Sequence, residues 1–255
     1  MAHEKMRMVY HQQLRYQAKL HGYLREETEY VVRYVSQTGD KGYIMWSSVN
    51  SSNALQVIRK ELAYFSHRHQ KFEWKVYDYD QPHDLIDLLK EEGFSVDNPE
   101  AVMVVELDAT HPLIQDETHI TVCEIIDQKG IQEIIDLEES VWNMSFTELR
   151  EKLIHDKKRD PESLSLYGVY ESNQLISGAW MYIEPNTQFV SLWGGSTLPS
   201  FRKKGYYTAL LRTRAQKALE KGHVFLTVDA SPMSRPILEK YGFVCIALAS
   251  GCQSQ

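Results

Sequence analysis

The amino-acid sequence predicts an α/β fold in two units, with helices and strands interleaved along the chain. At roughly 150 residues per domain, the chain length corresponds to about 1.7 domains. Hydrophobic residues make up 43% and charged residues 25% of the 255 residues, which excludes the disordered and fibrous classes. The order helix, aromatic-led strand, helix ending in Gly-Phe, strand occurs twice, through Gly93-Phe94 and Gly242-Phe243. Because glycine is a common helix C-cap, this repeat alone leaves duplication and chance both open.

In the first half, apolar residues at helical spacing predict helices, and short alternating runs between turn residues predict strands. A Thr-Gly-Asp-Lys-Gly turn at residues 38–42 is typical of a hairpin. Pro82 opens the last helix of this half and Gly93 ends it. The predicted helices are 4–20, 54–65 and 82–93, and the predicted strands are 30–35, 42–49, 72–79 and 101–107.

Residues 108–117 are polar, contain a proline and interrupt every periodic pattern. Such a stretch is typical of a boundary between domains. We therefore predict an N-terminal domain over residues 1–112 and a C-terminal domain over residues 113–255.

The second half reads as a complete α/β unit. Glu-Ser-Asn and Glu-Pro-Asn turns separate its three middle strands. A long helix ends at Gly222 and presents an apolar face, whereas the helix at 130–142 has one polar residue, Glu138, on its apolar face. The predicted helices are 130–142, 146–157, 205–221 and 234–241, and the predicted strands are 119–126, 164–170, 175–183, 189–198, 224–228 and 243–248.

The charge distribution favours a small anionic ligand over nucleic acid. The net charge is −7, yet residues 202–221 contain seven basic residues and one acidic residue, a local charge of +6. The longest apolar run, 243–249, is far shorter than the about 20 residues of a membrane span. Since the N-terminus has no signal-peptide pattern, we expect a cytoplasmic protein. The three scattered cysteines predict neither a disulfide framework nor a metal site.

Residues 197–208 combine a strand end, a short basic turn and the start of a long helix. The first turn of a helix leaves N–H groups without partners and carries about half a positive charge, a geometry that binds phosphate. Gly205 lets the main chain approach a ligand closely, and Arg202, Lys203 and Lys204 add charge suited to a diphosphate. Arg-x-x-Gly alone also fits a solvated basic turn.

The order of elements around this turn resembles the GNAT superfamily of acyl-CoA N-acyltransferases. In that family a Gln/Arg-x-x-Gly-x-Gly/Ala turn holds the coenzyme A pyrophosphate, and a later helix ends in Gly-Phe. Residues 197–202 match the family's Val-x-Pro-x-x-Arg pattern, with Thr in place of Val. The resemblance covers residues 119–249 and implies tandem GNAT-like domains, each a mixed, mostly antiparallel sheet flanked by helices. The N-terminal domain is degenerate, because its corresponding turn at 47–53 has neither glycine nor a basic residue.

The resemblance also implies which residues bind acetyl-CoA, the expected co-substrate. Backbone groups of Gly195 and Thr197 would hold the acetyl carbonyl and the pantetheine, and the amides of residues 203–207 would hold the pyrophosphate. The expected cofactor-binding residues are Gly195, Ser196, Thr197, Leu198, Arg202, Lys203, Lys204, Gly205, Tyr206, Tyr207 and Thr208.

Three positions depart from the family pattern. Tyr207 replaces the last Gly/Ala of the turn, so its side chain must point into the core or away from the phosphates. Ser191 stands where many relatives carry a general-base Glu. Leu238 stands where a Tyr frequently protonates the leaving thiolate.

The catalytic candidates that remain are Asp229, Ser231 and Ser234, near the end of a strand. Asp229 could accept an amine proton, or it could cap the next helix; the serines could relay a proton or cap that helix. His155 fits a solvent-exposed role better than a catalytic one. Four aromatic residues could line an acceptor pocket or pack in the core: Trp142, Trp180, Tyr182 and Trp193.

The predicted function is direct transfer of an acetyl group from acetyl-CoA to a primary amine of a small molecule or peptide, by a monomer or homodimer. One alternative, favoured by Ser191 and Leu238, is that the protein is catalytically silent and serves as an acyl-CoA-binding or regulatory module. Another alternative is that the resemblance is accidental and the basic turn binds a different phosphate ligand. Release of free CoA with amines separates the first two.

Overall fold

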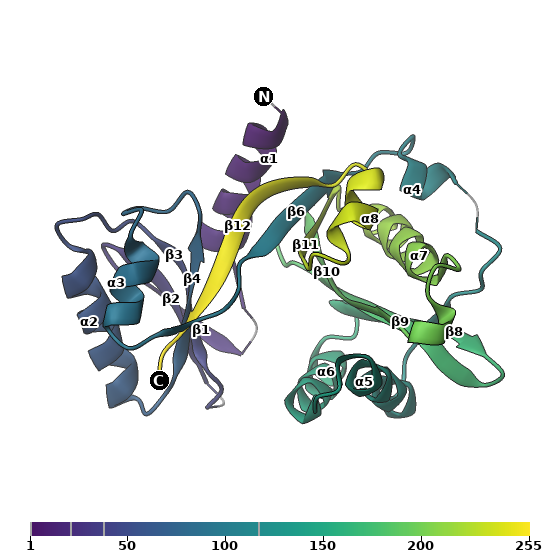
Figure 1. The fold of residues 1–255 in the computed structure, drawn as a ribbon, viewed down its shortest axis with the longest axis horizontal. Coiled ribbons are helices and arrows are strands. Elements are labelled where there is room, and N and C mark those ends of the chain that lie inside the picture. Colours follow the sequence, from purple (N-terminus) through teal and green to yellow (C-terminus); the bar gives the residue numbers. More distant parts are fainter. Residues whose placement is uncertain (1, 21, 38, 117) are drawn as a thin grey trace. The chain divides into compact units, whose positions relative to one another are not determined.

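The computed structural model describes residues 2–20, 22–37, 39–116 and 118–255. The chain forms two compact units (Figure 1). The first contains Met1–Met103, Asp229–Glu239 and Val244–Gln255, and the second contains Val104–Val228 and Lys240–Phe243. This division differs from the predicted domains 1–112 and 113–255, because the last strand of the chain pairs with a strand of the N-terminal half.

The sheet of the first unit contains an antiparallel run followed by a parallel pair. β1, β2 and β3 are antiparallel neighbours, β4 lies parallel to β3, and β12 runs antiparallel to β4 with the short β5 on it. Cys252 of β12 is opposite Trp74 of β4, and both are fully buried. The strands are β1 (Tyr23–Glu27), β2 (Val31–Ser36), β3 (Gly42–Ser47), β4 (Phe72–Tyr77), β5 (Ser95–Val96) and β12 (Val244–Gln253).

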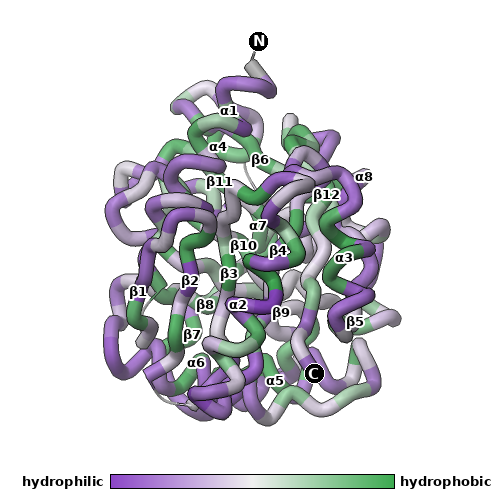
Figure 2. The backbone as a smooth tube through the Cα atoms, turned by 90° about the vertical axis from the view of Figure 1, so that its left-hand side faces the viewer, coloured by the Kyte–Doolittle hydropathy of each residue, from purple (hydrophilic) through white to green (hydrophobic). Residues whose placement is uncertain are grey.

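Side chains on both faces of this sheet are covered, as the alternation along β2 shows. Val31 and Val35 pack in the core under α2 and α3, whereas Val32 and Tyr34 pack against the N-terminal segment. Figure 2 shows that β2 is largely hydrophobic. Its sequence Val-Val-Arg-Tyr-Val-Ser contains one charged residue, Arg33. The helical elements are α1 (Ala2–Tyr10), a π-helix η1 (His11–Tyr16), α2 (Ala54–His67), α3 (Leu85–Glu91) and α8 (Arg235–Lys240).

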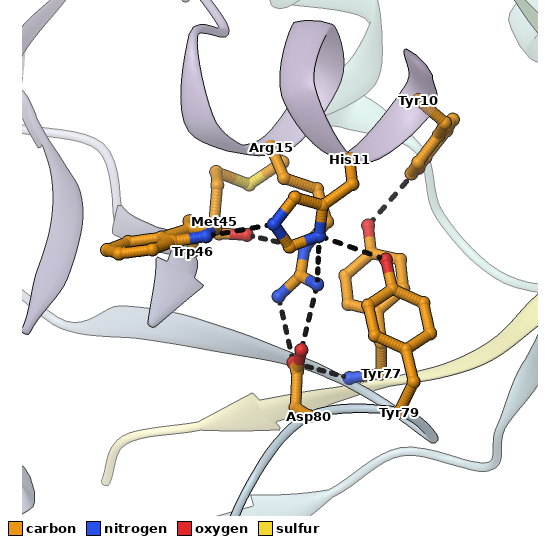
Figure 3. Close-up of polar contacts among 8 residues, drawn as sticks. All are labelled: Tyr10, His11, Arg15, Met45, Trp46, Tyr77, Tyr79 and Asp80. Carbon is orange, nitrogen blue, oxygen red and sulfur yellow. Dashed lines mark hydrogen bonds and ion pairs between the residues drawn. The ribbon is translucent and has the colours of Figure 1, made fainter. Parts of the chain in front are cut away.

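A buried ion pair attaches the N-terminal segment to this sheet (Figure 3). The two terminal guanidinium nitrogens of Arg15 donate to the carboxylate of Asp80, each at 2.8 Å, and Arg15 Nε donates to the Met45 carbonyl at 3.0 Å. The Arg15 side chain is fully buried and lies 3.8 Å from the Tyr77 ring centroid. The Trp46 indole donates to His11 Nε2 at 3.1 Å, so this nitrogen carries no proton.

The second unit has the same kind of sheet. β7, β8, β9 and β10 are antiparallel neighbours, and β11 runs parallel to β10. α5 and α6 cover one face and α7 covers the other (Figure 1). The strands are β7 (Cys123–Ile125), β8 (Leu164–Glu171), β9 (Gln174–Ile183), β10 (Phe189–Thr197) and β11 (Phe225–Ala230). The helices are α4 (Pro112–Gln115), α5 (Gln128–Trp142), α6 (Thr147–Arg159), a 3-10 helix η2 (Pro199–Phe201) and α7 (Tyr206–Glu220). The remaining strand, β6 (Glu100–Glu106), and β11 each run from one unit into the other.

The internal repeat predicted from the sequence is present in both halves of the chain. In each, a helix connects two parallel strands: α2 joins β3 to β4, and α7 joins β10 to β11. The following short helices, α3 and α8, precede Gly93 and Gly242, which have φ of 92° and 79°. The predicted fold, two α/β units with mixed and mostly antiparallel sheets, is confirmed.

Several elements differ from the prediction. The helix predicted over 4–20 ends as the π-helix η1, which contains the buried cation Arg15. The strand β1 was not predicted, because its sequence Tyr-Leu-Arg-Glu-Glu lacks a clear alternation. Of the strand predicted over 119–126, only β7 pairs with a neighbour. Thr38 of the predicted hairpin turn and Glu117 of the predicted boundary lie outside the described residues.

Candidate functional site

The strand β10 bends immediately before the basic turn. Its pairing with β9 is irregular between Gly194 and Ser196, and Gly194 and Gly195 have φ of 65° and 92°. A Cβ atom on Gly194 would lie 2.4 Å from the Trp180 ring, and one on Gly195 would lie 2.7 Å from the Tyr207 ring. The bulge therefore needs both glycines, and it turns the backbone of β10 out of the regular ladder.

The turn after β10 leads directly into α7. Gly205 has φ of 89°, and the first backbone hydrogen bond of the helix runs from Ala209 N to Gly205 O at 2.9 Å. Among the described residues, no hydrogen bond occupies the amides of residues 203–208. Residues 202–205 are exposed, so these amides and the helix dipole face a position that a diphosphate can reach.

The basic side chains of the turn do not all point to the same place. Arg202 Nε donates to the Thr197 carbonyl at 3.1 Å and thereby holds the turn against the end of β10. The Lys204 ammonium lies 5.0 Å from the Phe201 ring centroid, and Lys203 adopts φ of 64°. Arg202 thus contributes to the shape of the turn, whereas Lys203 and Lys204 are exposed cations within it.

Tyr207 and Arg214 fix α7 against the sheet. The Tyr207 ring packs over Gly195, as expected for a side chain directed into the core, and burial raises its pKa. Arg214 is buried and donates to the carbonyl oxygens of Trp180 and Trp193, each at 3.2 Å. Burial lowers the pKa of Arg214 to about 10, so it is still a cation at neutral pH. The start of α7 is therefore held rigidly beside the bulge.

The catalytic candidates Asp229, Ser231 and Ser234 belong to the first unit. Asp229 accepts a hydrogen bond from the ammonium of Lys75, a partner that sequence reasoning missed. The Ser231 hydroxyl accepts from Ser234 N at 3.3 Å and lies 3.2 Å from the Ser234 hydroxyl, which is a capping arrangement before α8. Leu238 is fully buried and packs in the core.

Two carboxylates that the predicted site did not include lie beside serines of β10. Glu138 Oε2 accepts from Ser196 Oγ at 2.8 Å and from Trp142 Nε1 at 2.9 Å, and burial raises the pKa of Glu138. Glu184 accepts from the Ser191 hydroxyl, and burial raises its pKa as well. Glu138 could have been found from its place on an apolar helix face, whereas no sequence signal marks Glu184.

The four aromatic candidates divide into two pairs. Trp180 is buried, and Tyr182 is half-buried with its hydroxyl donating to Asp156 at 2.9 Å. Trp142 and Trp193 are 49% and 50% exposed, which is too much for core residues. His155 is exposed on α6.

Among the described residues, no group of three or more metal-binding side chains is present. No helix of the described residues is long and apolar enough to cross a membrane.

Comparison with known proteins connects this site with one family. The model of the acetyltransferase (GNAT) family matches residues 131–243, which include β10, the turn and α7. No curated protein matches the chain in sequence.

Solved structures with the same fold extend over nearly the whole chain. A GCN5-related N-acetyltransferase from Kribbella flavida has a TM-score of 0.67 and 12% identity, covering 98% of this chain and 94% of that one. A functionally unknown conserved protein from Staphylococcus epidermidis has a TM-score of 0.69 and 9% identity, covering 98% of both chains. A tandem GNAT protein from the clavulanic acid biosynthesis pathway has a TM-score of 0.61 and 10% identity, covering 93% of this chain and 85% of that one. The resemblance to the acetyltransferase (GNAT) family that the sequence indicates is therefore confirmed over residues 131–243.

Proposed function

We propose that the protein transfers an acetyl group from acetyl-CoA to a primary amine of a small molecule or peptide. The observation that carries this proposal is the exposed turn at 202–205, where unoccupied amides, glycine and basic charge coincide at the start of α7. We further propose that it acts in the cytoplasm, as a monomer or homodimer, and not on nucleic acid.

In this proposal, positioning and backbone polarisation of the thioester account for most of the rate enhancement. The amides of residues 203–207 hold the pyrophosphate, and the backbone at Gly195 and Thr197 holds the acetyl carbonyl and the pantetheine. The other residues proposed to bind the coenzyme are Ser196, Leu198, Arg202 and the side chains of the turn up to Thr208. When bound, the coenzyme supplies the thioester and the thiolate leaving group.

Calorimetric titration with CoA tests the coenzyme site, and we expect one CoA per chain. The turn of the first unit that corresponds to the basic turn, between β3 and α2, has no glycine and no basic residue to meet a diphosphate. A stoichiometry of two would show that the first unit also binds the coenzyme. Absence of binding would refute the proposed function.

Ser231→Ala is expected to lower turnover by about 10-fold at most, with CoA binding retained. The departing thiolate has a pKa of about 8.5 in solution, so an acid is helpful without being required. A serine hydroxyl is a poor acid and would act only as a relay, which places it at or below the low end of general acid–base effects. Unchanged turnover in Ser231→Ala, Ser234→Ala and the double variant would show that water protonates the thiolate.

Asp229 is proposed to accept the proton of the amine. The variant Asp229→Asn is tested by the same measurements of turnover and CoA binding as the serine variants. Because its carboxylate is already paired with Lys75, the variant also leaves that half-buried ammonium without its counter-ion. Lys75→Met is therefore the comparison that separates loss of the pair from loss of a base. If the unmodified protein binds CoA but shows no turnover with amines, the alternative of a catalytically silent acyl-CoA-binding protein is favoured.

A further inference from the structure

Glu184 and Ser191 lie next to each other on adjacent strands of the second unit. Glu184 directly follows β9, and Tyr182 and Ile183 are opposite Ser191 and Val190 of β10. The Ser191 hydroxyl donates to Glu184 Oε1 and accepts from the Trp193 indole at 3.0 Å. A serine that uses its single proton in this way cannot donate to another group, so its role is to hold the carboxylate and the indole.

The free oxygen of Glu184 is available for a further donor. The hydrogen bonds of the described residues leave Glu184 Oε2 without a partner. Burial raises the pKa of Glu184, while the Ser191 hydroxyl and the ammonium of Lys152 oppose this rise. A carboxylate with a raised pKa binds a proton more readily than one in water.

The charged groups around Glu184 come from α6 and the end of β9. Lys152 pairs with Asp156 at 2.5 Å, and Arg159 pairs with the same carboxylate at 3.1 Å. Tyr182 donates to Asp156, so this acid is already occupied by three partners. Glu184 is therefore the carboxylate of this cluster that has an unused acceptor.

The position of the cluster fits an amine that approaches the bulge along β10. Ser191 and Trp193 are opposite Tyr182 and Trp180, so both point to the sheet face covered by α5 and α6. Half of the Trp193 ring is exposed, and an indole face attracts cations. At about 3.3 Å per residue, Ser191 and Gly195 are roughly 13 Å apart along the strand, so a proton would travel through water between them.

We propose that Glu184, positioned by Ser191, takes the role of proton acceptor in place of Asp229, whose carboxylate is paired with Lys75. Glu184 would accept the proton of a primary alkylammonium acceptor that lies against the exposed face of Trp193. This inference rests on the proposed function. The ammonium gives one proton through water to Glu184, and the neutral nitrogen attacks the thioester carbonyl. The C–N bond forms, the C–S bond breaks, and the second nitrogen proton goes to the departing sulfur. Glu184 then releases its proton to solvent. Ser191 and Trp193 are the positioning residues.

The test measures free thiol released from acetyl-CoA with n-butylamine and with benzylamine between pH 5 and 9. We expect Glu184→Gln to lower kcat/KM about 100-fold at neutral pH, which is the low end of a general base effect. In the unmodified protein kcat/KM should fall at acidic pH as Glu184 becomes protonated, and this acidic limb of the pH profile should be absent from the variant. Ser191→Ala should keep that limb and shift it to higher pH, because the hydroxyl bond that lowers the pKa of Glu184 is lost. Unchanged CoA affinity shows that each variant is folded.

Glu151→Gln is the matched control, because it removes the same charge from an exposed position on α6 and should leave the pH profile unchanged. If Glu184→Gln turns over like the unmodified protein, the inference is overturned while the proposed function stands. If the unmodified protein binds CoA but releases no thiol with either amine, both the alkylamine assignment and the proposed transfer are overturned. Failure to bind CoA would instead locate the error in the coenzyme site.

Discussion

Gly205→Glu is expected to abolish detectable CoA binding, with at least a 100-fold rise in Kd, about 2.7 kcal/mol. Two causes act together. Gly205 has φ of 89°, a conformation that favours glycine, and the added carboxylate would stand among the amides that we propose bind the pyrophosphate. Isothermal titration calorimetry with CoA measures the affinity directly. Circular dichroism and the unfolding temperature report whether the fold is retained.

Two control variants separate charge from backbone strain. Gly205→Ala imposes the same strained φ without the carboxylate, so it should weaken binding much less than Gly205→Glu. Gly222→Glu places the same residue at the other end of α7, where φ is 82° and a Cβ atom has nothing within 4 Å. It should leave CoA affinity unchanged. Equal affinity in Gly205→Glu and the unmodified protein would contradict the assignment of this turn.

Asp80→Asn should lower the free energy of unfolding by about 3–5 kcal/mol, the usual cost of removing one partner of a buried ion pair. Arg15 would keep its charge in a fully buried position, and its remaining neighbours would be the Met45 carbonyl, His11 Nδ1 at 3.4 Å and the tyrosine rings (Figure 3). Asp80 also accepts from the Tyr77 amide at 3.0 Å, a bond that the amide oxygen of Asn can retain. Urea unfolding followed by tryptophan fluorescence measures the change.

Asp87→Asn is the control for this measurement, because it removes a carboxylate from the ion pair with Lys90, whose partners are 72% and 53% exposed. Exposed pairs contribute little, so its unfolding midpoint should stay close to that of the unmodified protein. The double variant Arg15→Met, Asp80→Leu should recover much of the lost stability, since no charge remains buried. Similar midpoints for Asp80→Asn and Asp87→Asn would show that the buried pair is not needed.

The parts of the site that the sequence could predict depend on local geometry. A strand end, a turn with Gly205 and basic residues, and a helix start follow one another directly, so no knowledge of distant contacts was needed. The same holds for the two Gly-Phe helix ends and for the alternating strands of both units. For Tyr207 the sequence left two orientations open, into the core or away from the expected phosphates, and the ring packs over Gly195.

The remaining features depend on which distant segments meet. Glu184 reaches Ser191 because the register of β9 and β10 is set by the turn between them, and one residue of slip would separate the two side chains. Lys75 reaches Asp229 although more than half of the chain lies between them. The predicted N-terminal helix ends as a π-helix that contains the buried Arg15, whose partner Asp80 follows a strand far along the chain. Periodicity carries no information about such pairings.

The pairing of β12 with β4 has a consequence for synthesis on the ribosome. Chains generally fold from the N-terminus as they emerge. Here the whole of Val104–Val228 must be made before Val244–Gln253 can cover β4 and Cys252 can enter the core of the first unit. Until then β4 has one unpaired edge, a template for pairing with other chains. The nascent N-terminal half therefore passes through a period of exposure to aggregation and to chaperones that the second unit, formed almost entirely from continuous sequence, avoids.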